Sequence, residues 1–198
     1  MKLADYKRIF FAVGLIGVLL IASPILEVFR LPSGEAFSEL YLLGPNHIAQ
    51  DIPFNVAVDL NYSVYLGVGN HLGESAYYVC YVKLRNQTEP LPDETAQTPS
   101  PLPPLYQYRS IIQDGKNWTA PLTFSISNVS VSQNQSKLES ITINNAKFDV
   151  AKTAQFDPEN SGYYYQLFVE LWAFNSQSGA FQYQDRYVYF WLNVTSHA

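Results

Sequence analysis

The chain has 198 residues and a formal net charge of -5, with 12 Lys and Arg against 17 Asp and Glu. This acidic balance leaves no basic surface for nucleic acid, so we expect no nucleic-acid partner. Aromatic residues make up 15% of the chain, which favours β-strands over helices. A single cysteine excludes an intrachain disulfide framework and a thiolate metal cluster. The composition therefore predicts an all-β protein without a cofactor.

An uncharged apolar segment covers residues 9–26 and is long enough to cross a bilayer at about 1.5 Å per residue. The apolar core of a cleaved signal peptide is shorter, at about 7–15 residues. The small pair Ala22-Ser23 would suit cleavage, but Pro24 follows it directly. A buried core helix is the other alternative, and the lack of a polar face argues against it. We expect an uncleaved transmembrane helix over residues 9–29, in contact with the lipid bilayer.

The charges beside this segment predict its orientation. Lys2, Lys7 and Arg8 precede it, and positive residues remain on the cytoplasmic side of a membrane. We therefore expect a single-pass protein of the cell membrane with its N-terminus in the cytoplasm. The expected parts are a cytoplasmic tail (1–8), the helix (9–29), a linker (30–36) and an extracytoplasmic domain (37–198).

Short alternating runs separated by turn residues follow the linker, which is typical of an antiparallel β-sandwich. We expect strands over residues 37–43, 63–70, 76–85, 106–112, 122–127, 138–143, 163–174 and 186–194. Residues 70–73 fit a hairpin turn with Gly73 at positive φ. A stretch rich in proline covers residues 89–104, and we expect a long loop there because proline cannot donate to a central ladder.

Alternation within the strands predicts which side chains form the core. In the run of residues 76–85 the charged Lys83 and Arg85 alternate with Cys80, so we expect the thiol to be buried and structural rather than reactive. The residues expected to be buried are Tyr78, Cys80, Val82, Leu167, Val169, Leu171, Val188, Phe190 and Leu192.

The opposite face of the last two expected strands is aromatic. An exposed patch of such rings would mark a recognition face for a sugar, a membrane interface or an envelope protein. Two alternatives remain open: the rings stabilise the sheet as cross-strand pairs, or the proline-rich loop covers them. The residues of this possible recognition face are Phe168, Trp172, Tyr187, Tyr189 and Trp191.

Six tripeptides fit the N-glycosylation pattern, and all follow the apolar segment. Their number exceeds chance expectation and favours a glycosylated, extracytoplasmic domain. Sugars there would add bulk and solubility rather than chemistry. The acceptor residues are Asn61, Asn86, Asn117, Asn128, Asn134 and Asn193.

No local pattern indicates catalysis. His47, His71 and His197 are scattered and lack the spacing of a metal site, so turn or terminal positions explain them better. Gly67-Val-Gly69 lies inside an expected strand and precedes no helix, which excludes a phosphate-binding loop. We therefore expect no enzyme, no catalytic residues, no metal and no cofactor.

Two segments carry a resemblance to a known family. Residues 39–53 open with Glu-Leu-Tyr-Leu-Leu-Gly-Pro, and residues 66–74 read Leu-Gly-Val-Gly-Asn-His-Leu-Gly-Glu. These segments, with Trp118 and Pro121-Leu-Thr-Phe124 and with Ser136-Lys-Leu-Glu139 further on, resemble the archaeal membrane-protein family of domain of unknown function 1616. The resemblance runs from about residue 37 to the end and implies an immunoglobulin-like domain without assigned activity. Many members carry several membrane helices upstream, whereas this sequence has one apolar segment.

Together these observations predict an immunoglobulin-like antiparallel β-sandwich of 7–8 strands behind a single transmembrane helix. Its expected role is a non-catalytic structural or recognition module of an archaeal cell envelope. The alternative is a glycan-binding module that uses the aromatic face, and a surface hydrolase is a more remote one.

Overall fold

The computed structural model describes residue 6, residues 10–17 and residues 35–195. The chain divides into two compact units, Met1–Ala36 and Phe37–Ala198. In the first unit the described residues 10–17 are helical. Within the described part of the chain, no helix has both the length and the apolar character needed to cross a membrane. Residues 18–29 of the expected transmembrane helix, and most of the expected tail and linker, lie outside the described residues.

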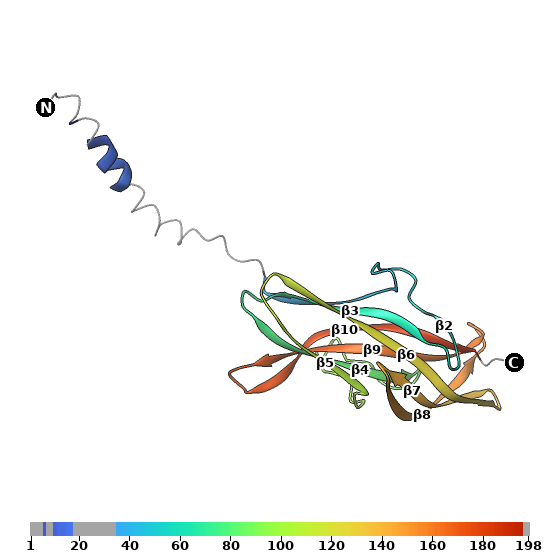
Figure 1. Cartoon of the computed structure of the whole chain (residues 1–198). Coiled ribbons are helices and arrows are strands. Elements are labelled where there is room, and N and C mark those ends of the chain that lie inside the picture. Colours follow the sequence, from blue (N-terminus) through green and yellow to red (C-terminus); the bar gives the residue numbers. More distant parts are fainter. Residues whose placement is uncertain (1–5, 7–9, 18–34, 196–198) are drawn as a thin grey trace. The chain divides into compact units, whose positions relative to one another are not determined.

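The second unit is built from β-strands (Figure 1). Its strands are β1 (Phe37–Leu43), β2 (Asn55–Ala57), β3 (Tyr62–His71), β4 (Ala76–Asn86), β5 (Tyr106–Ile112), β6 (Lys116–Ser132), β7 (Gln135–Ile143), β8 (Ala146–Asp157), β9 (Gly162–Asn175) and β10 (Ala180–Thr195). The prediction of an all-β domain is confirmed.

The strands form one curled sheet with two halves. The first half has the order β1-β3-β6-β7-β8, and the second has the order β5-β4-β9-β10-β2. A short pairing of β8 with β9, Phe156 with Tyr163 and Asp157 with Gly162, joins the halves. Every pairing is antiparallel except that of β10 with β2. The ten strands form one continuous sheet, so the predicted sandwich of 7–8 strands is not confirmed.

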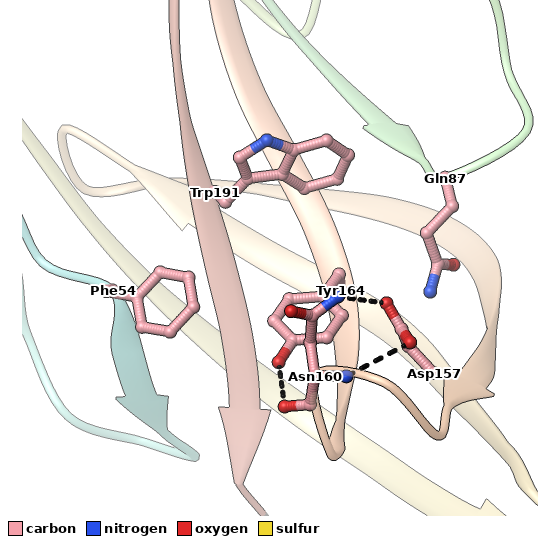
Figure 2. A pocket seen from close by; sticks show the side chains of 6 residues that line it. All are labelled: Phe54, Gln87, Asp157, Asn160, Tyr164 and Trp191. Carbon is pink, nitrogen blue, oxygen red and sulfur yellow. Dashed lines mark hydrogen bonds between the residues drawn. The ribbon is translucent and has the colours of Figure 1, made fainter.

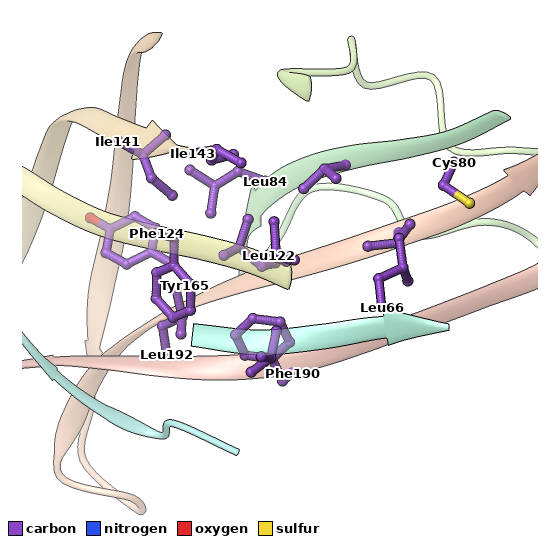
Figure 3. Close-up of a cluster of buried hydrophobic side chains, with 14 of the residues drawn as sticks. Leu66, Cys80, Leu84, Leu122, Phe124, Ile141, Ile143, Tyr165, Phe190 and Leu192 are labelled. Atoms are coloured by element: carbon purple, nitrogen blue, oxygen red, sulfur yellow. The ribbon is translucent and has the colours of Figure 1, made fainter. Parts of the chain in front are cut away.

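One hydrophobic core fills the space inside the curl (Figure 3). Both halves contribute to it, and the rings of Phe124 on β6 and Phe190 on β10 lie with their centroids 5.6 Å apart. Fully burying a side chain of this size stabilises the fold by about 1.5–3 kcal/mol. The prediction of buried residues is confirmed for Tyr78, Cys80, Val82, Leu167, Val169, Leu171, Phe190 and Leu192.

Val188 is the exception, because it is only partly buried where it packs against the core. It lies close to a register shift between Tyr183 and Tyr187, where β10 has extra residues opposite β9. Asp185 takes a positive φ of 51° within this bulge. Such a bulge bends the strand and changes the direction in which neighbouring side chains point.

The turns explain which strands sequence reasoning found and which it missed. Gly73 has a φ of +84°, as predicted for the hairpin that joins β3 to β4. Strand β8 was missed, although Asn144 and Asn145 directly precede it with φ values of 46° and 67°. Two successive residues at positive φ make the tight turn of a two-residue hairpin, and asparagine favours it. The Asn-Asn pair was therefore an available signal for β8.

Candidate recognition pocket and the strap beside it

The outer face of β4, β9 and β10 brings together most of the residues of the predicted recognition face. The strand register places them in rows across the three strands. One row consists of Lys83, Phe168 and Tyr189. The row on one side of it consists of Tyr81, Glu170 and Tyr187, and the row on its other side consists of Arg85, Gln166 and Trp191.

A segment between β4 and β5 covers the rows around Glu170. We call residues 89–104, the predicted proline-rich loop, the strap. The backbone N–H of Ser100 donates to Glu170 Oε1 at 2.8 Å, and its carbonyl accepts from Lys83 Nζ at 2.8 Å. Further along, the Tyr187 hydroxyl donates to Glu94 Oε1 at 2.8 Å. The strap is therefore fastened to all three strands.

Lys83 and Glu170 form an ion pair beneath the strap. Their Nζ and Oε2 atoms lie 2.9 Å apart, and the side chains are 5% and 0% exposed. Buried charges are costly to remove from water, so each needs further hydrogen bonds beyond its partner. The backbone of Ser100 supplies one further hydrogen bond to Lys83 and one to Glu170. The Trp172 indole N–H donates another to Glu170 Oε2 at 3.2 Å. This network explains how two charges are held beneath the proline-rich strap.

Burial beneath the strap corrects the predicted recognition face. Phe168 was predicted on the exposed face, but it is fully buried. Trp172 and Tyr187 are half-buried, whereas Tyr189 is 48% exposed. The proline-rich loop therefore lies against this half of the face through its hydrogen bonds to Lys83, Glu170 and Tyr187. Strand alternation identified the outer side of the sheet but carried no information on what lies over it.

The half of the same face around Trp191 opens into a pocket of about 510 Å³. Figure 2 shows its lining residues, which come from four separate parts of the chain. They are Phe54, Gln87, Asp157, Asn160, Tyr164 and Trp191. A volume of this size lies in the range of small-molecule sites.

Three aromatic rings form the walls of the pocket. Phe54 and Tyr164 have their centroids 5.9 Å apart, and Tyr164 meets Trp191 edge-on at 6.5 Å and 88°. The guanidinium of Arg85 lies over the Trp191 ring at 5.6 Å and also donates to the carbonyls of Asn86 and Gln87. Phe54 is 47% exposed and is positioned by its carbonyl, which accepts from the Asn193 N–H at 2.7 Å. The rings are thus held in place, with Phe54 exposed to solvent, Trp191 half-buried and Tyr164 buried.

Asp157 and Asn160 form the polar side of the pocket in the turn between β8 and β9. Asp157 accepts from the N–H groups of Glu159 and Asn160 and, at 2.8 Å, from the Asn160 side-chain amide. The Asn160 side chain is the main reason that the pKa of Asp157 lies below its usual value. The Tyr164 hydroxyl donates to the Asn160 carbonyl at 2.6 Å, which ties the turn to the aromatic wall. The pocket therefore presents an ionised carboxylate and fixed amide groups beside its rings.

Gly162 makes this geometry possible at the start of β9. A Cβ atom at this position would lie 2.3 Å from Asn193 Oδ1 and 2.8 Å from the Tyr164 hydroxyl. Only glycine lets the turn approach β10 this closely. Of the lining residues, only Trp191 belonged to the predicted face. Sequence reasoning missed the others because the pocket joins Phe54, Gln87 and the turn after β8, which are far apart along the chain.

The six predicted glycosylation acceptors fall into two groups. Asn61, Asn117, Asn128 and Asn134 are exposed. Asn86 and Asn193 are engaged, because their side-chain amides donate to the Thr153 carbonyl and to Asn55 Oδ1, respectively, each at 2.9 Å. Both engaged residues lie beside the open pocket, since each is adjacent in sequence or register to a lining residue.

The histidines and the cysteine occupy structural positions where the structure describes them. His47 stacks on Tyr65, and His71 stacks on Phe37 and lies 3.6 Å from a Glu39 carboxylate oxygen. His197 lies outside the described residues. Cys80 is buried, and burial raises the pKa of its thiol to about 12. Across the part of the chain that the structure describes, no three His, Cys, Asp or Glu side chains gather as a metal site would require.

The family described as Domain of unknown function (DUF1616) matches residues 31–193. The search of curated proteins found no match.

Among solved structures, a beta-glucosidase from Listeria innocua in complex with isofagomine shares 12% identity with a TM-score of 0.41. That likeness covers 82% of this chain but only 16% of the beta-glucosidase chain. A chain from the complex of Zinc 2-glycoprotein and Prolactin inducible protein from human seminal plasma shares 11% identity, with a TM-score of 0.39 and coverage of 83% and 100%. Spo0M, a sporulation control protein from Bacillus subtilis, shares 12% identity, with a TM-score of 0.35 and coverage of 83% and 51%. At these TM-scores the likenesses carry no argument about function.

Proposed function

The chain belongs to the family of domain of unknown function DUF1616, and on that premise we propose that it is a non-catalytic recognition module of an archaeal cell envelope. In this proposal residues 9–29 anchor it in the membrane, and the immunoglobulin-like domain lies outside. The uncharged run of residues 9–26 supports the anchor. So do the large apolar side chains of the helical residues 10–17, among which Phe10 is 83% and Phe11 78% exposed.

The proposed ligand is a glycan, bound in the open pocket. The observation that carries this proposal is the combination of three aromatic walls with Gln87, Asp157 and Asn160 in one pocket. A sugar ring has apolar C–H faces and a rim of hydroxyl groups, so it suits aromatic faces beside amide and carboxylate groups. Asp157 would accept hydrogen bonds from sugar hydroxyls, and Gln87 could both donate and accept.

The chemistry of the pocket favours binding over hydrolysis. A glycosidase typically needs two carboxyl groups, one of them a general acid with a raised pKa. Asp157 is the one carboxylate among the lining residues, and its pKa is lowered rather than raised. A surface hydrolase is therefore the weaker interpretation.

A glycan array probed with the full chain tests this function. We expect binding to a restricted set of glycans, and a lower signal for Phe54→Ala because it removes one aromatic wall. Phe54 is 47% exposed, so its loss should leave the fold intact. The matched control is Leu60→Ala, which removes a similarly exposed apolar side chain outside the pocket. An array without signal above background, or equal signals for both variants, would exclude glycan binding in this pocket.

A further inference from the structure

A row of three aromatic rings and an isoleucine, all exposed or half-buried, lies at the other end of the outer face from the pocket. It crosses β5, β4, β9 and β10 and consists of Ile111, Tyr77, Phe174 and Phe181, which we call the entry patch. Ring centroids lie 5.1 Å apart for Tyr77 and Phe181 and 5.5 Å apart for Phe174 and Phe181. Ile111 is 73% and Phe174 42% exposed. A contiguous apolar surface of this kind indicates an interaction site.

Arg109 completes the patch with a positive charge. Its guanidinium lies 5.3 Å from the centre of the Phe181 ring and donates to the Tyr77 hydroxyl at 3.1 Å. Arginine and tyrosine present an apolar body and a polar tip, and such side chains are common where protein meets the headgroup region of a bilayer. The chemistry of the entry patch therefore suits a lipid interface.

The chain enters the domain at the same end. Ser38 is the second residue of β1, and its hydroxyl shares a hydrogen bond of 2.7 Å with the hydroxyl of Tyr78. Tyr78 directly follows Tyr77, which belongs to the entry patch. The proposed anchor, residues 9–29, precedes this entry point with seven residues, 30–36, between them. Seven residues span at most about 24 Å when fully extended. A bilayer that holds residues 9–29 would therefore keep the entry patch within reach of its surface.

We propose that the entry patch lies in the headgroup region of the bilayer that anchors the chain; this inference rests on the membrane anchoring in the proposed function. The tether makes the contact intramolecular, so a weak affinity is sufficient. The turns at this end carry Glu74 and Asp114 as well as Lys116, and Asp114 accepts from the Gly73 N–H. Because both signs are present, the contact should form with zwitterionic lipid and should not require anionic lipid.

This contact has a consequence for the pocket. Strand β9 runs from Gly162 beside the pocket to Asn175 beside the entry patch. At about 3.3 Å per residue its 14 residues separate the two ends by about 43 Å. Docking of the entry patch would direct the pocket away from the membrane, toward the envelope.

The test uses the full chain reconstituted in phosphatidylcholine vesicles. Cys80 is buried with a raised thiol pKa and should not react, so Phe174→Cys offers a single site for an environment-sensitive fluorophore. Glu159→Cys, in the exposed turn beside the pocket, is the matched control. We expect lipids spin-labelled at the headgroup to quench the probe at residue 174 several-fold more than the probe at residue 159. Ile111→Ser should reduce the quenching at residue 174, whereas Ile48→Ser, an exposed apolar change elsewhere, should not.

Each other outcome overturns the inference in a distinguishable way. Equal quenching at residues 174 and 159 in a chain that floats with the vesicles overturns the docking alone. A chain that does not float with the vesicles overturns the anchoring and the docking with it. If the probe at residue 174 escapes the lipid quencher but responds to dilution with unlabelled chain, the entry patch contacts a second copy instead.

Discussion

Two halves of one sheet face share strands and residue types but differ in what covers them. In the half around Glu170, which we call the strapped half, the strap is hydrogen-bonded to a buried ion pair, and Phe168 is fully buried. In the half around Trp191, which we call the open half, no residue of the strap lines the space, and the rings of Phe54, Tyr164 and Trp191 form a pocket. The connecting segments, rather than the strand pattern, therefore decide whether an aromatic face stabilises a fold or offers a binding site.

The largest expected effect is at the ion pair of the strapped half. Glu170→Ala leaves the buried ammonium of Lys83 without its carboxylate, so we expect the free energy of unfolding to fall by about 3–5 kcal/mol. Urea unfolding measures this change. Asp157→Ala, the matched change in the open half, should cost much less because that carboxylate lies in an exposed turn. Replacing both charges, with Lys83→Met and Glu170→Leu, should recover much of the loss. Equal losses for Glu170→Ala and Asp157→Ala would contradict the difference between the halves.

A smaller effect is expected in the wall of the open half. Gly162→Ala would place a methyl group 2.3 Å from Asn193 Oδ1, and accommodating such a clash costs about 1–3 kcal/mol. Thermal unfolding should detect this loss, and glycan binding should weaken because Tyr164 moves with the turn. Glu159→Ala, in the same turn but exposed, is the control and should change neither quantity. A Gly162→Ala variant as stable as the control would refute the close approach.

Sequence reasoning reached the strands and the core because both follow from local alternation. The run of residues 186–194 separates Phe190 and Leu192 from Trp191, and the structure buries the first two. It failed at Phe168, which is fully buried although it lies on the outer side of the sheet, because alternation does not report what lies over a face. The aromatic pattern identified Trp191 as part of the open half. Phe54 and Asn160 reach the pocket only through the parallel pairing of β2 and the turn after β8, which no local pattern reports.

The hydroxyl of Tyr187 in the strapped half should make the stability of the fold depend on pH in the alkaline range. Burial first, and then the hydrogen bond to Glu94, raise the pKa of Tyr187 from 10.0 to about 12. A raised pKa contributes stability that is fully present below pH 10 and is lost as the pH rises through about 12. Tyr187→Phe should cost about 0.5–1 kcal/mol at neutral pH and should flatten this alkaline loss relative to the wild type. Tyr189→Phe, on an exposed ring in the same strand, is the control. If stability depends on pH in the same way in both variants, the Tyr187 hydroxyl does not help to hold the strap in place.

The smallest effect concerns modification rather than stability. In a host that attaches N-glycans, we expect occupancy at Asn61, Asn117, Asn128 and Asn134, whose side chains are exposed. Asn86 and Asn193 should remain free because their amides are engaged beside the open half. Mass spectrometry of the glycopeptides measures occupancy site by site. Sugars on Asn193 would contradict an accessible pocket next to it.

The most direct test compares one tryptophan from each half, Trp191→Ala and Trp172→Ala, with the strongest glycan from the array and a thermal melt. We expect Trp191→Ala to bind at least about tenfold more weakly, a change of about 1.4 kcal/mol. Its Tm should fall less than that of Trp172→Ala, because it loses ring contacts with Tyr164 and Arg85 rather than a hydrogen bond to the buried ion pair. Trp172→Ala should bind as the wild type does but lose about 2 kcal/mol of stability, or about 4–8 °C in Tm, because it gives up its indole bond to Glu170 and its contact with Tyr81. Weakened binding in Trp172→Ala together with unchanged binding in Trp191→Ala would contradict the assignment of recognition to the open half.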